Sequence, residues 1–128
     1  MSRDIRYFSM DDVTRTIHRL GLGRIRDIGL LESALHRPQT VVFGVESYVG
    51  IFDKAAALLQ SLVKNHALFD GNKRLALSAT VLFLGMNGYE LVSDEDETFE
   101  FMLDCARDQL ELEALSSWLR DHSVRIPT

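Results

Sequence analysis

The chain has 128 residues, of which 46% are hydrophobic and 26% are charged, which is the size and composition of one globular domain. Its single cysteine, Cys105, excludes an internal disulfide framework and a zinc site built from several thiolates. A formal charge of −5 argues against a protein that wraps nucleic-acid phosphates, so we expect no direct nucleic-acid partner.

No segment of the sequence predicts insertion into a membrane. The longest nearly apolar run, from Leu75 to Met86, is too short to cross a bilayer. The N-terminal residues lack the apolar core of a signal peptide. We therefore expect a cytoplasmic protein without membrane partners, organised as a single domain over residues 1–128.

Acidic residues are concentrated in the later part of the chain. Residues 1–40 carry a net charge of +2, whereas residues 41–128 carry a net charge of −7. Much of this excess follows Ser93, as Asp94, Glu95, Asp96, Glu97 and Glu100. Serine is a good N-cap and acidic side chains are favourable near the positive end of a helix dipole, so this cluster predicts the start of a helix. A binding surface is the alternative interpretation.

The first third of the chain predicts two helices and one extended segment. Ser9 and Asp12 resemble a capping box, and the apolar stripe that follows predicts a helix that ends at Gly21. A short helix is expected over residues 29–36, because a proline soon follows and disfavours helical backbone before it. Residues 40–44 are rich in β-branched side chains and end in glycine, which predicts an extended segment or small hairpin.

The rest of the chain predicts four more helices. From residue 51 onward apolar residues recur at spacings of three and four, and His66 falls at the end of this apolar face. Residues 72–87 are apolar nearly all round, which is typical of a helix surrounded by others, so we expect this helix to be central. Two further helices are expected over about residues 94–107 and 111–122. The sequence therefore predicts an all-α fold of about six helices.

The segment 66–74 lies between the two longest expected helices and combines an imidazole, a carboxylate, an amide and two cations. A helix that begins near Asn72 presents unpaired backbone N–H groups to an anion. Gly71 allows the backbone to approach a bound phosphate closely. Lys73 and Arg74 add positive charge at the same place. This segment therefore predicts a phosphate site.

Two other side chains of the segment complete a possible active site. Asp70, beside bound phosphates, would be a natural ligand for Mg²⁺. His66 is the nearby group whose ordinary pKa suits a general base near neutral pH. Phe69 is expected to anchor the loop in the core.

The same residues also have simpler interpretations. His66 would then be a packed core histidine, Asp70 a helix cap, and the residues after Gly71 an ordinary solvated first turn. However, basic residues in a first turn are unfavourable against the helix dipole unless an anion compensates. This local inconsistency favours a functional site.

The segment resembles the motif of the Fic/Doc family, His-x-Phe-x-(Asp/Glu)-(Gly/Ala)-Asn-(Gly/Lys)-Arg. The residues that match it in spacing are His66, Asp70, Gly71, Asn72, Lys73 and Arg74. The phenylalanine of the motif stands two places after the histidine, where this chain has Leu68, and Phe69 follows it. The resemblance covers about residues 20–92 and is greater to the short death-on-curing (Doc) proteins than to the larger Fic enzymes.

The resemblance implies the compact helical Fic fold and the transfer of part of a nucleotide onto a protein hydroxyl. The resemblance implies that His66 is the general base and that Asp70 is the Mg²⁺ ligand. It also implies that the phosphates of ATP are bound by Gly71, Asn72, Lys73 and Arg74. Doc proteins carry Lys where AMP-transferring relatives carry Gly, so Lys73 implies transfer of the γ-phosphate to a Ser or Thr hydroxyl. The target that it implies is elongation factor Tu, whose modification inhibits translation.

The resemblance also implies a protein partner. Many Fic proteins restrain themselves with a (Ser/Thr)-x-x-x-Glu-(Gly/Asn) helix, and no glutamate in this sequence is followed by Gly or Asn. We therefore expect the toxin of a type II toxin–antitoxin system, restrained by a Phd-like antitoxin whose C-terminal tail folds into a groove. A protein adenylyltransferase and a catalytically silent interaction module are the alternatives.

Overall fold

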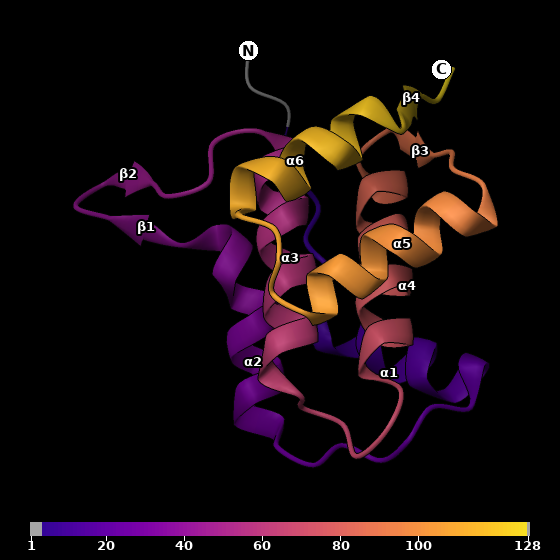
Figure 1. Ribbon diagram of the computed structural model, residues 1–128. Helices are drawn as coiled ribbons and strands as arrows, with labels where there is room; N and C mark the ends of the chain where they lie inside the picture. Colours follow the sequence, from indigo (N-terminus) through magenta and orange to yellow (C-terminus); the bar gives the residue numbers. More distant parts are fainter. Residues whose placement is uncertain (1–3, 128) are drawn as a thin grey trace.

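The computed structural model describes residues 4–127, and these residues have the expected all-α architecture (Figure 1). The helices are α1 (Met10–Leu20), α2 (Ile28–His36), α3 (Ile51–Asn65), α4 (Asn72–Met86), α5 (Glu95–Ala106) and α6 (Leu112–Asp121). A 3₁₀ turn, η1 (Arg37–Gln39), follows α2. No helix in this part of the chain is long and apolar enough to span a membrane.

Within residues 4–127, four short strands form two antiparallel pairs. β1 (Val41–Val42) and β2 (Val45–Glu46) make the small hairpin that the sequence predicts before α3. β3 (Tyr89–Leu91) pairs with β4 (Ser123–Arg125), which brings the C-terminus back to the end of α4. The sequence does not predict this second pair, because strands of three residues are too short to show an alternating pattern.

The central helix of the fold is α3 rather than α4. It packs against α2, η1, α4, α5 and α6, and its side chains at residues 54–59 are buried all round. Three consecutive alanines, residues 55–57, allow neighbouring helices to approach α3 from several sides. By contrast, Val81 and Leu82 of α4 are 38% and 43% exposed. The prediction that α4 is surrounded is therefore wrong, because this side of α4 is only partly covered within residues 4–127.

The helix starts follow their side-chain caps, with one difference from the sequence prediction. At α1 the hydroxyl of Ser9 accepts the N–H of Asp12, and the Asp12 carboxylate accepts the N–H of Ser9, which confirms the capping box. At α5 the cap is Asp94 rather than Ser93, because its carboxylate accepts the N–H of Glu97 at 2.7 Å. Ser93 stands one residue too early to reach that N–H.

The β1–β2 hairpin projects away from the helices and is held at its base (Figure 1). The buried Lys54 donates to the Glu46 carboxylate at 2.9 Å and to the Tyr48 carbonyl at 2.7 Å. Arg37 donates through Nε to the Tyr48 hydroxyl at 2.8 Å. At the tip, Phe43 is fully exposed and has a φ of 50°. The hairpin is therefore an apolar projection on a firmly bonded base.

A stack of rings joins the last two helices. Phe101 of α5 stacks on Trp118 of α6 with 3.8 Å between ring centroids, and His122 stacks on Trp118 at 3.9 Å. The His122 ring nitrogens lie 2.8 Å from the Trp118 carbonyl and 3.1 Å from the Glu97 carboxylate. Desolvation lowers the pKa of His122, but these two acceptors outweigh it, and the pKa is raised above its ordinary value. When the ring is protonated it can donate to both acceptors, and it then links the end of α6 to the first turn of α5.

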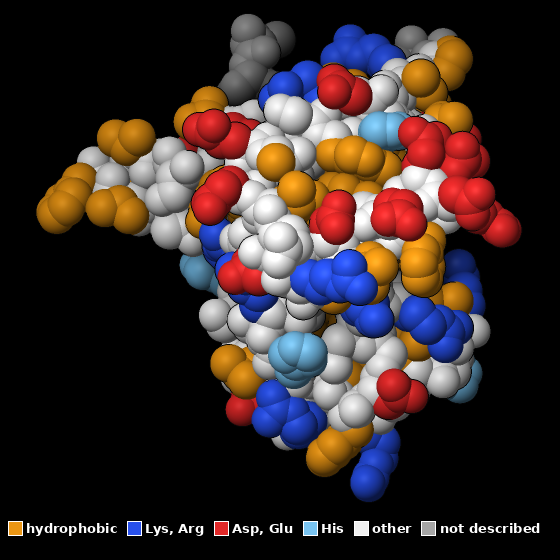
Figure 2. Space-filling view, in the orientation of Figure 1, with side chains coloured by type: hydrophobic (Ala, Val, Ile, Leu, Met, Phe, Trp, Pro, Cys, Tyr) orange, Lys and Arg blue, Asp and Glu red, His pale blue; other side chains and the backbone are white. Residues whose placement is uncertain are grey.

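Opposite charges gather on different parts of the surface. In Figure 2 acidic side chains border α5, whereas Lys and Arg lie below α5 in this view and again at the top, near α6 and the C-terminus. The acidic side chains that are concentrated in the sequence after Ser93 are therefore also grouped in space.

We predict that the free energy of unfolding decreases slightly as the pH rises above about 6.5. A histidine whose pKa is raised by folding stabilises the protein fully below its unfolded pKa, and this contribution is lost as the pH passes the folded pKa. For a partly exposed ion pair the change should be at most about 1 kcal/mol. Urea unfolding at several pH values measures it. His122→Gln should flatten this pH dependence, and the exposed control His36→Gln should retain it; equal slopes in the two variants would contradict the prediction.

Candidate active site

The segment that carries the motif connects the C-terminal end of α3 to the N-terminal end of α4, at the bottom of the view in Figure 1. α3 ends at Asn65, and His66 has a left-handed conformation with φ 47° and ψ 49°. This turn takes His66 out of the apolar face of α3, and the residue is exposed. The interpretation of His66 as a packed core histidine is therefore wrong, and its imidazole is accessible from solvent.

The backbone of His66 is held by Arg26. The Arg26 guanidinium donates to the His66 carbonyl through Nε at 2.9 Å and through Nη2 at 2.6 Å. On the preceding residue, the Asn65 side chain donates to the carbonyl of Leu30 in α2 at 2.9 Å. A left-handed conformation is unfavourable for residues other than glycine. These hydrogen bonds therefore stabilise the turn that presents the imidazole.

Residues 22–27, which we call the strap, run antiparallel to the loop and fix its backbone. The N–H of Phe69 donates to the carbonyl of Arg24 at 2.9 Å. The N–H of Arg26 donates to the carbonyl of Ala67 at 2.7 Å. The loop is therefore bonded to the strap on both sides of Leu68, much as a short strand is bonded to its neighbour.

The strap comes closest to the loop at Gly23. The N–H of Gly23 donates to the carbonyl of Asp70 at 3.2 Å. A side chain at this position would place its Cβ 2.9 Å from the backbone nitrogen and oxygen of Asp70, so only glycine permits this approach. Gly23 thereby sets where Asp70 lies relative to the start of α4.

The two apolar residues of the loop have opposite environments. Leu68 is 2% exposed and belongs to the core, whereas Phe69 is 63% exposed and lies 5.5 Å from the guanidinium of Arg24. The prediction that Phe69 anchors the loop is wrong. Leu68 anchors it instead, and it stands two places after the histidine, where the motif has phenylalanine. The departure of one residue from the motif therefore leaves the anchor in its usual place.

The first turn of α4 has the properties of an anion site. Its N-cap, Gly71, has a φ of 88° and no side chain that could cap the helix, so the first N–H groups stay available to a ligand. Lys73 and Arg74 are exposed beside them. The side chain of Asn72 accepts the N–H of Leu68 at 2.9 Å and donates to its carbonyl at 3.0 Å. Asn72 therefore shapes the loop with its side chain and offers an anion its backbone N–H.

Asp70 places an exposed carboxylate at the end of the loop, and this carboxylate makes no ion pair within residues 4–127. No cluster of three or more His, Cys, Asp or Glu side chains in the described part of the chain could hold a metal ion by itself. A single free carboxylate beside an anion site fits Mg²⁺, which binds through one or two carboxylates together with phosphate oxygens.

A groove of about 400 Å³ adjoins the anion site between α4 and α5. Lys73 and Arg74 line it together with the apolar side chains of Leu77 and Phe99. Phe99 is 65% exposed. Such a groove can hold an apolar or aromatic group of a ligand whose anionic part lies at the first turn of α4.

All six predicted site residues lie in this loop and in the first turn of α4, but the sequence does not reveal what holds them. Arg26, Gly23 and Asn65 have this function, and hydrogen bonds to a backbone carbonyl leave no signal in residue spacing.

Cys105 lies elsewhere, in α5, where burial raises the pKa of its thiol to about 12. A thiol with such a pKa stays protonated and is not a nucleophile.

Comparison with known proteins places the chain in a family. Residues 5–84 match the family described as the Fic/DOC family. The chain is 46% identical over 107 residues, 82% of either sequence, to the protein named Toxin Doc of Mycolicibacterium smegmatis. It is 30% identical over 100 residues, 78% of either sequence, to the protein named Protein kinase doc of Escherichia phage P1. The chain therefore belongs to the Fic/DOC family, as its motif predicts.

We predict that Gly23→Ala destabilises the protein and displaces the loop, because the new Cβ must push the backbone of Asp70 away. The expected loss is about 1–3 kcal/mol of the free energy of unfolding, as for other overpacked sites. Gly85→Ala is the matched control, because a Cβ there meets nothing within 4 Å. That change should be neutral or stabilise α4 by up to about 1 kcal/mol. Equal stability of the two variants in urea unfolding would argue against a close approach at Gly23.

Proposed function

We propose that this protein is the toxin of a type II toxin–antitoxin system and that it transfers the γ-phosphate of ATP to a Ser or Thr hydroxyl of a target protein. Elongation factor Tu is the proposed target, by resemblance to Doc proteins, and inhibition of translation is the proposed effect. The observation that carries this proposal is the loop itself, in which an exposed, backbone-fixed His66 shortly precedes the anion site of α4. The two relatives, one named a toxin and one a protein kinase, support it.

In the proposed reaction the hydroxyl oxygen of the target attacks the γ-phosphorus of ATP and forms a new P–O bond. The bond from the γ-phosphorus to the oxygen that bridges it to the β-phosphate breaks, and ADP leaves. His66 takes the hydroxyl proton as general base. The N–H groups of the first turn of α4, with Lys73 and Arg74, bind the phosphate oxygens. Asp70 would hold Mg²⁺, whose charge neutralises the phosphates when it is bound.

Lys73 favours transfer of phosphate over transfer of AMP. Members of the family that transfer AMP have glycine here, which leaves room for two phosphates against the helix start. A lysine side chain fills part of that space and adds charge, so the nucleotide should bind in the reverse direction with its γ-phosphorus toward His66. AMP transfer is the second candidate, because the rest of the motif is shared. A silent module is disfavoured, because both His66 and Asp70 are present and exposed.

ATP labelled at either the α- or the γ-phosphate distinguishes these candidates. With Mg²⁺ and purified elongation factor Tu or bacterial extract, we expect protein-bound label from γ-labelled ATP alone. His66→Ala should lower the transfer rate by about 10²–10⁴, the usual contribution of a general base. The control His36→Ala replaces another exposed histidine outside the site and should keep the rate. Both variants should unfold at nearly the wild-type temperature, since neither side chain is in the core.

Each other outcome of this experiment has a definite meaning. Label from α-labelled ATP would mean AMP transfer and would overturn the interpretation of Lys73. No label from either form, across several extracts, would favour the silent module. A His66→Ala protein with the wild-type rate would remove His66 from the mechanism.

A Phd-like antitoxin is the second part of the proposal. α1 and α4 border a groove of about 540 Å³, which includes the exposed Val81 and Leu82 and is edged by Arg15 and Arg19. An amphipathic helix can cover an apolar groove of this kind, and a disordered tail can fold into it on binding. Leu77 lines both this groove and the groove beside Lys73. A bound tail would therefore lie next to the proposed phosphate site.

We predict that Leu82→Glu weakens binding of the proposed Phd-like antitoxin, because it removes apolar contact and buries a charge. Loss of one buried leucine should raise the Kd by about 10- to 100-fold in calorimetry. The control Val124→Glu changes a similarly exposed residue on β4 and should leave the Kd unchanged. If both variants bind like the wild type, the tail docks elsewhere.

A further inference from the structure

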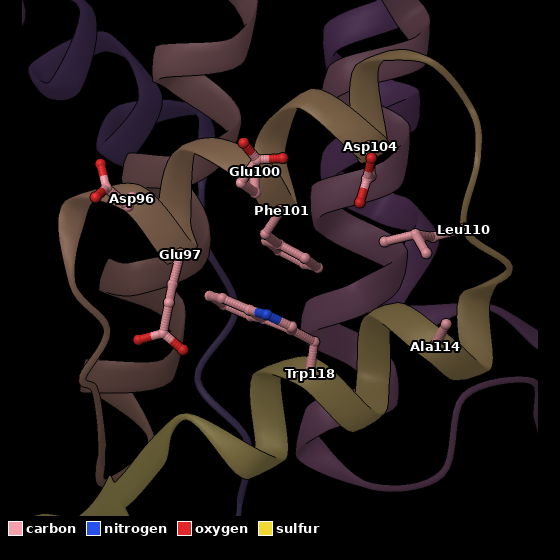
Figure 3. Close-up of a pocket in the computed structure, with 8 residues that line it drawn as sticks. All are labelled: Asp96, Glu97, Glu100, Phe101, Asp104, Leu110, Ala114 and Trp118. Carbon is pink, nitrogen blue, oxygen red and sulfur yellow. The ribbon is translucent and has the colours of Figure 1, made fainter.

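Another groove lies between α5 and α6, on elements that take no part in the loop of His66. We call it the α5–α6 groove; its volume is about 490 Å³ (Figure 3). Its apolar lining consists of Phe101, Leu110, Ala114 and Trp118, and its acidic lining of Asp96, Glu97, Glu100 and Asp104. In Figure 2 this region is an apolar surface bordered by acidic side chains. The groove is therefore apolar along its floor and negative along its rim.

The floor of the groove is made of stacked rings. Phe101 is 3% exposed and stacks on Trp118 almost in parallel, with an angle of 4° between the rings. Trp118 is partly exposed and also stacks on His122. A floor of stacked rings can bind an apolar side chain without losing much conformational entropy on binding.

The rim carries negative charge that the fold does not require. Asp96, Glu100 and Asp104 follow one another at intervals of four residues, so they share one face of α5, where like charges destabilise the helix. None of the three forms an ion pair within residues 4–127, whereas Glu97 bonds His122.

The helix dipole explains only part of this charge. Asp96 lies in the first turn of α5, where a carboxylate is favourable, but Asp104 lies in the last turn, where it is unfavourable. The interpretation of the acidic cluster as a helix start therefore accounts for its beginning and not for Glu100 or Asp104. These two carboxylates, which lie beside the apolar floor, complement a cationic partner.

We propose that the α5–α6 groove binds a basic segment of a partner protein, with an apolar side chain on the floor and Lys or Arg side chains along α5. The row from Asp96 to Asp104 spans about 12 Å, which is the length of two turns of a bound helix. This surface is separate from both the proposed phosphate site and the α1–α4 groove, so the inference does not depend on the proposed function.

Trp118 is the single tryptophan of the chain and lies on the floor, so its fluorescence reports binding directly. The probe is a tryptophan-free helical peptide with leucines on one face and lysines on the other. We expect saturable quenching or enhancement that weakens as salt increases. One control peptide replaces the lysines with glutamates, and a second replaces the leucines with alanines. Both should bind at least about tenfold more weakly, because each lacks one half of the complementarity.

Variants with equal changes of net charge separate this groove from general attraction to an acidic protein. The double variant Glu100→Gln with Asp104→Asn should raise the Kd of the probe about tenfold. The control Glu32→Gln with Glu90→Gln removes two exposed carboxylates elsewhere and should leave the Kd nearly unchanged. Equal effects of the two pairs, or full binding by the alanine peptide, would overturn the proposal. Circular dichroism should show that both variants keep their helices.

Discussion

The paired hydrogen bonds from Arg26 to the carbonyl of His66 are the interaction on which the rest of the site depends. They stabilise the left-handed residue that ends α3, and this turn directs the imidazole outward rather than into the core. Arg26 is itself placed by its neighbours. Gly21 ends α1 in a left-handed conformation, and the Asp27 carboxylate caps α2 by accepting the N–H of Leu30. The strap is thus fixed at both ends by helix caps.

The proposed phosphate site and the α5–α6 groove each adjoin a charge that the dipole of their own helix disfavours. Lys73 and Arg74 stand at the positive end of the α4 dipole, and Asp104 stands at the negative end of the α5 dipole. In a helix selected only for stability the signs would be reversed. Both places also border an apolar groove. Such mismatches between local stability and residue choice are expected where a ligand supplies the missing charge.

The sequence predicts well whatever depends on local interactions. The helices, the capping box of Ser9 and the hairpin before α3 follow from spacing, capping and residue preference within a few neighbouring residues. The motif also places the proposed site at the start of α4. These features need no knowledge of the tertiary structure.

Most errors of prediction concern tertiary packing, although the cap of α5, which is Asp94 instead of Ser93, is a local one. α3 is the central helix because its alanines allow several helices to pack closely against it. Hydrophobicity alone predicts instead that α4 is central. Leu68 rather than Phe69 enters the core because the backbone of the loop is fixed by the strap, and periodicity cannot report a loop of this shape. The stabilising contacts of Arg26 with His66 and of Gly23 with Asp70 join residues forty or more positions apart in the sequence, so no local pattern contains them.

The separation of charge on the surface also affects how molecules approach this protein. Exposed Lys73 and Arg74 make the start of α4 positive, and the carboxylates along α5 make that helix negative; such a separation of charge orients incoming charged molecules before contact. An anionic nucleotide and a cationic protein segment would be steered to different regions and would not compete for the same encounter. Their association rates should both fall as ionic strength rises, since screening shortens the range of each field. The surface charge would thus direct anionic and cationic ligands to different sites before either one binds.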